Sequence, residues 1–347
     1  MYQALYRKWR PQTFADVIGQ QHITDTLRAQ LQSGRLSHAY LFTGTRGTGK
    51  TTCAKILARA VNCEHPVNGD PCNECAACRG ILDGSVLDVT EIDAASNNGV
   101  DNIRDLRDET RYTPAQVRKR VFIIDEVHML SIGAFNALLK TLEEPPEHVL
   151  FILATTELHK VPATILSRCQ RFDFRRIGAE DISRRLLDVA AGEGIALTEG
   201  AARLIARLAD GAMRDALSML DRAAAAGAVD EKTVTAALGV MGQDDGIRLA
   251  EHLKTGDLAA AVGLLDEYYN AGRDLASVYD QMLGLIRDAL LVKTSKTDVS
   301  ALISPAYSVK TLQALCDGLA SSTLIAWSRI ISDSLDHMRT AANRRVE

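Results

Sequence analysis

A glycine-rich segment constrains the fold of this 347-residue chain more than any other feature. The residues from Gly44 to Thr51 follow the spacing GxxxxGK[ST]. Before them, residues 39–43 form an apolar run that suits a buried strand, and residues 51–61 carry apolar side chains at helical spacing. A glycine-rich turn between a strand and a helix directs backbone N–H groups toward a polyphosphate. This context favours a phosphate-binding loop over a chance glycine turn.

The loop contains the side chains that a nucleoside triphosphate with Mg²⁺ requires. We expect the Lys50 ammonium to neutralise β- and γ-phosphate oxygens and the Thr51 hydroxyl to ligate Mg²⁺. The predicted nucleotide-binding residues of this segment are Gly44, Thr45, Arg46, Gly47, Thr48, Gly49, Lys50, Thr51 and Thr52.

An acidic strand end supplies the second half of a nucleotide site. Four apolar residues, 121–124, precede Asp125 and Glu126, as expected for a strand buried on both faces. In open α/β sheets ligands bind at the carboxyl ends of the strands. We expect Asp125 to hold Mg²⁺ through water and Glu126 to orient and polarise the attacking water. An acidic pair after a strand can also be a solvated helix start, but the presence of Lys50 and Thr51 favours the catalytic interpretation.

Four of the seven cysteines are clustered with the spacing Cys63-x8-Cys72-x2-Cys75-x2-Cys78. Such short spacing lets thiolates converge on one metal ion. Zinc in a structural role is the predicted occupant, because four thiolates leave no open position for a catalytic water. An iron–sulfur cluster is the alternative, although the bacterial ferredoxin spacing differs and has proline after its last cysteine. The other cysteines are predicted to be small core or boundary residues: Cys53, Cys169 and Cys316.

Strand and helix patterns predict an α/β fold followed by helices. Apolar strand candidates at 39–43, 86–92, 121–125, 149–155 and 170–174 alternate with helical segments, which argues for a parallel sheet. We predict a nucleotide-binding domain over 1–178 with a zinc module near 62–80, a helical lid over 179–241 and a helical collar over 242–347. Thr198 and Asp230 are helix N-cap candidates.

Composition is that of an ordinary globular protein, with 46% hydrophobic and 24% charged residues. No apolar run approaches a membrane span, and residues 1–10 lack the apolar core of a signal peptide. A cytoplasmic location is therefore expected, in which clustered cysteines rarely form disulfides.

Three further positions are individually weak signals. Thr155 ends the strand candidate 149–155, where it could contact a γ-phosphate or simply suit a strand. Arg168 follows a short helix and could merely satisfy its last carbonyls. Arg214 could be a solvated helix charge.

Together with the phosphate loop and the cysteines, these positions fall within motifs that resemble the γ/τ subunits of bacterial DNA polymerase III clamp loaders, a family of AAA+ ATPases. The resemblance covers the first two predicted domains, and the third matches by position and helical character. The motifs are residues 6–14 (YRKWRPQTF), 93–101 (DAASNNGVD), 124–130 (IDEVHML), 135–146 (FNALLKTLEEPP), 153–157 (LATTE) and 165–169 (ILSRC).

The resemblance implies roles for these residues. Thr155 would be sensor 1, Arg214 would be sensor 2, and Arg168 would be an arginine finger that reaches the ATP of a neighbouring subunit. Val17 and Ile18 would line the adenine pocket. The family loads the sliding clamp onto primed template DNA within the DNA polymerase III holoenzyme. The implied partners are δ- and δ′-type subunits and further copies of the chain in a pentamer, with ATP, Mg²⁺ and Zn²⁺ as cofactors.

Contact with DNA would have to be local, because the net charge of −4 argues against a nucleic-acid-binding surface over the whole protein. Arg104, Arg46 and Lys140 are candidates for the inside of an assembled ring, and Arg104 fits the family pattern best. A solvated helix charge is the alternative for Arg104. Asn97 and Asn98 stand where other members carry basic residues, which weakens the case for strong phosphate contacts there.

Two other classes of protein share parts of this pattern. Asp125-Glu126-Val127-His128 with the phosphate loop could belong to a DExH helicase, but a helicase requires a second α/β domain where this chain predicts helices. A nonenzymatic scaffold could bind nucleotide without hydrolysing it, and the intact Lys50, Asp125 and Glu126 disfavour that class.

Overall fold

The structure is a computed structural model that describes residues 3–225, 227–239, 243–271, 275–299, 302–303 and 307–338. The chain falls into two compact units. The first comprises Met1–Gly194 with Ile205–Asp221, and the second comprises Ile195–Leu204 with Arg222–Glu347. Each unit has a hydrophobic core of its own.

A five-stranded parallel sheet forms the centre of the first unit, in the order β2-β3-β4-β1-β5. Every residue of the central strands β1 and β4 is buried, as their continuous apolar runs predict. The strands are β1 (Ala39–Thr43), β2 (Val89–Asp93), β3 (Arg120–Asp125), β4 (Val149–Thr155) and β5 (Gln170–Asp173).

All five predicted strands are present, with small differences at their ends. β2 begins at Val89 instead of residue 86, because the Val86 N–H donates to the Gly80 carbonyl at 3.0 Å and so belongs to the end of the preceding helix. β5 ends one residue early at Asp173, although the N–H of Phe174 still donates to the Thr43 carbonyl at 2.7 Å.

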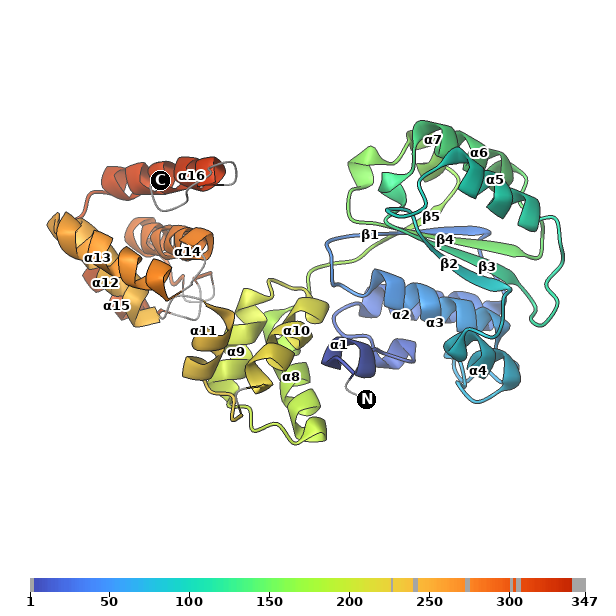
Figure 1. Cartoon of the computed structure of the whole chain (residues 1–347), viewed down its shortest axis with the longest axis horizontal. Coiled ribbons are helices and arrows are strands. Elements are labelled where there is room, and N and C mark those ends of the chain that lie inside the picture. The colour runs from blue at the N-terminus through green and yellow to red at the C-terminus, as the bar shows by residue number, and fades with distance from the viewer. Residues whose placement is uncertain are drawn as a thin grey trace. The chain divides into compact units, whose positions relative to one another are not determined.

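Helices cover both faces of the sheet (Figure 1). α2 (Gln21–Ser33) and α3 (Lys50–Asn62) lie on one face, where they pack with Tyr40 and Phe42 of β1. The opposite face carries α5 (Val100–Glu109), α6 (Ile132–Glu143) and α7 (Ala163–Leu166), which pack with Leu41 of the same strand. Successive residues of a strand point to opposite faces, so one apolar run serves two cores.

Shorter elements surround this framework. They are α1 (Leu5–Lys8), η1 (Phe14–Asp16), α4 (Ala76–Asp83), η2 (Val127–Met129) and η3 (Leu158–Lys160). α8 (Ala179–Glu193) follows the sheet and holds the N-terminal segment: Trp9 Nε1 donates to a Glu193 carboxylate oxygen at 2.7 Å, and Lys8 forms an ion pair with the same side chain.

The rest of the described chain is helical. α9 (Glu199–Leu208) and α10 (Met213–Ala224) each contribute residues to both units, and α11 (Glu231–Leu238) belongs to the second. Both predicted caps are confirmed, because Thr198 Oγ1 accepts the Ala201 N–H at 3.2 Å and Asp230 Oδ1 accepts the Thr233 N–H at 2.7 Å.

In its described residues the second unit continues with five helices whose apolar faces share one core. They are α12 (Gln243–Thr255), α13 (Leu258–Asn270), α14 (Leu275–Thr294), α15 (Val309–Cys316) and α16 (Ser321–Met338). The predicted domain boundary at 241/242 lies outside the described residues. Among the described helices, none combines the length and the apolarity that crossing a membrane requires.

Candidate functional site

The predicted phosphate loop connects β1 to α3 at the carboxyl end of the parallel sheet. Three glycines give it its course, because Gly44, Gly47 and Gly49 have φ of 142°, 77° and 107°, which L side chains rarely adopt. The loop also lies close to other backbone. A Cβ added at Gly47 would be 2.8 Å from the Cβ of Ala212.

Lys50 is held against the loop that precedes it. Its Nζ donates to the carbonyl oxygens of Gly44 and Thr45, each at 2.8 Å, and the residue is only 5% exposed. Burial lowers the pKa of Lys50, while the carboxylates of Glu126 and Asp125 act in the opposite direction. The Lys50 ammonium therefore lies beside the loop, where it can contact an anion bound there.

Thr51 and Asp125 come from different elements and meet directly. The Thr51 hydroxyl donates to Asp125 Oδ2 at 2.7 Å, and Asp125 Oδ1 accepts the N–H of Glu126 at 2.9 Å. Mg²⁺ prefers a few oxygen ligands from the protein and completes its shell with water and phosphate. The hydroxyl and carboxylate side by side fit that requirement.

Glu126 lies in the left-handed region, with φ of 48°, immediately after β3. Strain of this kind in a non-glycine residue persists only where surrounding contacts fix it. Here Thr156 Oγ1 donates to Glu126 Oε2 at 2.9 Å, and His128 Nδ1 lies 3.4 Å from the same oxygen. His128 Nδ1 is also 3.0 Å from Thr155 Oγ1. The structure thus joins the candidate residues Glu126 and Thr155 through a buried histidine.

Thr156 and His128 are not among the predicted site residues. Their position was the available signal, because each lies within three residues of the carboxyl end of a central strand. The sheet register pairs Thr43 with Thr155 and Asp93 with Asp125, so these ends form one edge.

A cavity of about 740 Å³ lies beside the loop in the first unit. This volume is in the range of ligand pockets in proteins. The predicted site residues that line it are Val17, Ile18, Arg46, Gly47, Thr48, Gly49, Lys50, Thr51, Thr52, Asp125, Glu126 and Arg214. The remaining residues predicted for the nucleotide site do not line the cavity: Gly44, Thr45, Thr155 and Arg168.

The N-terminal segment closes part of this cavity through Tyr6 and Arg10, which are not among the predicted site residues. The guanidinium carbon of Arg214 lies 4.9 Å from the centre of the Tyr6 ring, a cation–π geometry. Arg10 Nε donates to Thr52 Oγ1 at 3.1 Å. The grouping of aromatic and basic residues at 6–10 was the signal for this contact.

Arg168 lies outside the cavity and pairs with its own chain. Its Nη2 is 2.6 Å from Glu143 Oε1, and its Nη1 donates to the Thr164 carbonyl at 2.8 Å. The side chain is 33% exposed. The guanidinium is thus available at the surface of the first unit and absent from the lining of the chain's own cavity.

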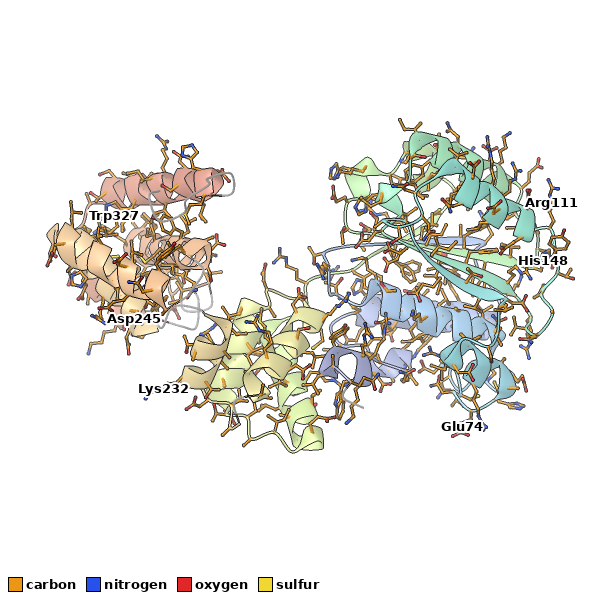
Figure 2. The ribbon with its side chains drawn as sticks, in the orientation of Figure 1. Glu74, Arg111, His148, Lys232, Asp245 and Trp327 are labelled. Carbon is orange, nitrogen blue, oxygen red and sulfur yellow. The ribbon has the colours of Figure 1, made fainter. Side chains whose placement is uncertain are left out.

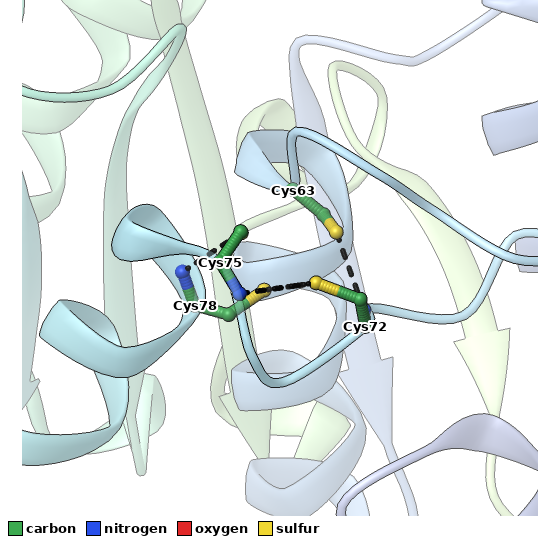
Figure 3. A group of neighbouring side chains, drawn as sticks. All are labelled: Cys63, Cys72, Cys75 and Cys78. Carbon is green, nitrogen blue, oxygen red and sulfur yellow. Dashed lines mark hydrogen bonds between the residues drawn. The ribbon is translucent and has the colours of Figure 1, made fainter.

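The four clustered cysteines converge at the end of α3 and the start of α4 (Figure 3). Their sulfur atoms all lie within 4.8 Å of one another, and those of Cys72 and Cys78 are 4.0 Å apart. A tetrahedral zinc site with Zn–S bonds of about 2.3 Å places its sulfurs about 3.8 Å apart. The donor set and its spacing therefore fit zinc.

Backbone N–H groups surround these sulfurs, as expected for a thiolate cluster. Cys72 Sγ accepts from the N–H of Glu74 at 3.5 Å and of Cys75 at 3.3 Å, and these bonds lower the pKa of the Cys72 thiol to about 6. The module is fastened to the sheet domain by Asp70, which accepts from Arg28 Nη2 at 2.6 Å. Glu74 lies at its outer end, away from the sheet (Figure 2).

The candidate DNA-contact residues are dispersed over the first unit. Arg46 lines the cavity, Lys140 is exposed on α6, and Arg104 on α5 forms an ion pair of 2.9 Å with Asp101. A DNA contact at these residues stays a prediction.

Comparison with known families divides the chain into three consecutive matches. The family described as DNA polymerase III, delta subunit, matches residues 19–178. The ATPase lid domain of DNA polymerase III clamp loader subunits matches residues 181–229, and domain III of DNA polymerase III subunits gamma and tau matches residues 229–347.

Individual relatives of the chain are also tau or gamma subunits of DNA polymerase III. DNA polymerase III subunit tau of Bacillus subtilis is 49% identical over 99% of this chain and 62% of its own length. The tau subunit of Escherichia coli is 47% identical over 85% of the chain and 46% of its own length. The gamma subunit of Buchnera aphidicola is 43% identical over 81% of the chain and 79% of its own length. The chain thus spans about half to two thirds of the tau subunits it matches.

A solved structure, the RuvB Holliday junction branch migration motor of Thermotoga maritima, superimposes with a TM-score of 0.52 at 16% identity, covering 71% of this chain and 79% of the other. This likeness concerns the fold alone, and it agrees with the predicted parallel-sheet domain followed by helices. On its sequence matches, the chain belongs to the gamma/tau family of DNA polymerase III clamp-loader subunits.

Proposed function

We propose that this chain is an ATPase subunit of a clamp loader, which opens the sliding clamp and places it on primed template DNA during replication. The observation that carries the proposal is the convergence of Lys50, Thr51, Asp125 and Glu126 on one cavity at the carboxyl edge of a parallel sheet. Family membership supports the clamp and DNA as the targets of the ATPase.

In the proposed site the loop from Gly44 to Thr52 cradles the phosphates, and Val17 and Ile18 face the adenine. Lys50 exchanges its two carbonyl acceptors for phosphate oxygens. Thr51 would ligate Mg²⁺ and Asp125 would hold it through water, and the ion would neutralise charge on the phosphates.

Hydrolysis needs a water that is oriented for attack on the γ-phosphate. Glu126 is the proposed base for this water, and Thr155 is the proposed γ-phosphate sensor. Thr156 donates to Glu126 Oε2, which orients the carboxylate and leaves its other oxygen to accept a proton from water. Arg214, which now stacks on Tyr6, lines the same cavity and is the proposed second sensor.

Arg168 is the proposed arginine finger for the nucleotide of a neighbouring subunit. Its position at the surface and outside its own cavity supports action in trans. Fingers of this kind contribute on the order of 10³ to 10⁵ in rate, so hydrolysis would depend on assembly. The proposed assembly is a pentamer with δ- and δ′-type subunits and further copies of the chain, located in the cytoplasm.

Each predicted domain has a proposed role. Residues 1–178 bind nucleotide, 179–241 form the lid that carries Arg214, and 242–347 form the collar that joins subunits. Zinc is the proposed ion of the cysteine cluster, with a structural role. Elemental analysis of the purified protein is expected to find zinc, and iron in its place would contradict the assignment.

A helicase is not favoured, since the described residues after 178 contain helices and no second sheet. The test of the loader function is ATPase measurement with partner subunits, clamp and primed DNA added stepwise. We expect Lys50→Ala to abolish ATP binding, and Arg168→Ala to leave binding largely intact while removing DNA-stimulated turnover. If the isolated chain hydrolysed ATP as fast as the assembly and Arg168→Ala had no effect, the trans mechanism would be wrong.

A further inference from the structure

The contact between Arg168 and Glu143 joins the ends of two helices. Glu143 is the last residue of α6, and Arg168 lies two residues beyond the end of α7. Arg168 Nη2 donates to Glu143 Oε1 at 2.6 Å, while Nη1 donates to the Thr164 carbonyl at 2.8 Å and to Ser167 Oγ at 3.1 Å. The Glu143 carboxylate thus holds one terminal nitrogen of the guanidinium, and the Thr164 carbonyl and Ser167 hydroxyl hold the other.

The placement of Glu143 is unfavourable by itself. The C-terminal end of a helix carries partial negative charge, so a carboxylate in the last turn of α6 is repelled by the helix that bears it. Arg168 compensates both this carboxylate and the free carbonyls of α7. With side chains 33% and 49% exposed, however, the pair contributes little to folding stability. Stability therefore does not account for a glutamate at this position.

We propose that Glu143 is a positioning residue for Arg168, which sets the orientation in which the guanidinium meets the nucleotide of the neighbouring subunit. This inference rests on the proposed trans function of Arg168. An arginine has five N–H donors, and three are engaged by Glu143, Thr164 and Ser167, which leaves two for a phosphate.

Fixing the guanidinium in advance has a kinetic consequence. An arginine side chain loses rotamer freedom when it is ordered, and a residue already held by its own subunit loses less of it at the moment of contact. Glu143 is thus expected to affect the rate of turnover. It should not affect ATP binding, which depends on the neighbouring subunit's phosphate loop. The expected signature is a lower kcat with an unchanged KM for ATP.

The test uses the full chain in a clamp loader reconstituted with partner subunits, clamp and primed DNA. We expect Glu143→Gln to lower the DNA-stimulated kcat about two- to fivefold, the range that corresponds to an exposed ion pair. Glu143→Asp, which keeps the charge, should recover part of the loss. The matched control is Glu144→Gln: Glu144 is the next residue, is exposed, and makes no side-chain ion pair within the described residues, so its kcat should stay unchanged.

A double-mutant cycle separates positioning from a structural role. In an Arg168→Ala background, Glu143→Gln should cause no further loss of stimulated turnover, because the group it orients is gone. An equal loss in both backgrounds would overturn the inference, as would a Glu143→Gln enzyme indistinguishable from Glu144→Gln or one with raised DNA-free turnover. If Arg168→Ala itself had no effect, the proposed trans function would fail first. Thermal melting of each variant checks that the chain is folded.

Discussion

Gly47 of the phosphate loop packs against Ala212, in the segment that leads to Arg214. A Gly47→Ala substitution, which adds one carbon, tests this contact. Gly47 has a φ of 77°, and a Cβ placed there would lie 2.8 Å from the Cβ of Ala212. Ala212 immediately precedes α10, which begins at Met213. Gly47→Ala is therefore expected to strain the loop and to press on the start of the helix that carries Arg214.

The expected cost has two parts. An L residue in the left-handed region costs about 1–2 kcal/mol. Forcing an extra carbon into a packed contact typically costs about 1–3 kcal/mol. The free energy of unfolding of the first unit should thus fall by about 2–5 kcal/mol in Gly47→Ala.

Two further variants separate these parts. Gly34 has a similar φ of 69° and nothing within 4 Å of an added Cβ, so Gly34→Ala measures the backbone cost alone. Adding Ala212→Gly to Gly47→Ala removes the opposing methyl and should recover about 1–3 kcal/mol, leaving the backbone cost in place.

Urea unfolding followed by tryptophan fluorescence measures these differences. The chain has two tryptophans, Trp9 in the first unit and Trp327 in the second (Figure 2), so a Trp327→Phe background makes Trp9 the reporter for the unit of interest. A Gly47→Ala variant no less stable than Gly34→Ala would refute the contact. So would a double variant no more stable than Gly47→Ala alone.

Two other predictions concern stability and metal content. Burial raises the pKa of Asp88, but hydrogen bonds from Arg120 and two backbone N–H groups outweigh it, so the pKa lies below its usual value. Asp88→Asn should cost about 3 kcal/mol at pH 7 in urea unfolding. A carboxyl group whose pKa is lower in the folded than in the unfolded chain stabilises the fold at pH values above its unfolded pKa. The difference in unfolding free energy between wild type and Asp88→Asn should therefore shrink as the pH falls below about 4. Chelation of zinc, or Cys72→Ser, should lower both the measured zinc content and the melting temperature of the first unit, whereas Cys53→Ala, at a buried cysteine outside the cluster, should keep its zinc.

Local patterns predicted the elements of the nucleotide site because each element carries its own signal. The strand before Asp125 is apolar at four successive positions, and the loop before Lys50 has three glycines at positions that require positive φ. A short CxxC spacing likewise predicts convergence of sulfurs without knowledge of the rest of the chain.

Contacts between distant segments could not be predicted in this way. The order β2-β3-β4-β1-β5 inserts β4 between β1 and β3 and so brings Thr155 to the edge that holds Thr51 and Asp125. Nothing in the local sequence of residues 149–155 specifies that neighbour. The contacts of Tyr6 with Arg214 and of Arg168 with Glu143 also depend on tertiary packing, and one sequence shows only that the side chains have the charge to make them.

The polar groups proposed to act on nucleotide share one property: each already has a partner in its own chain. Lys50 donates to two loop carbonyls, the Thr51 hydroxyl to Asp125, the Thr156 hydroxyl to Glu126, and Arg168 to Glu143. A buried polar group without a partner is costly, so the contacts of Lys50, Thr51 and Thr156 stabilise the site before ligand binds. For Lys50 the proposed phosphate contacts replace existing hydrogen bonds, and the exchange alone yields little free energy. Affinity must therefore come from placing the phosphate charges against Lys50, Mg²⁺ and the loop N–H groups. Arg168 differs, because its contacts with Glu143, Thr164 and Ser167 leave two N–H donors, so its proposed contact with the neighbouring nucleotide does not require the loss of the Glu143 pair.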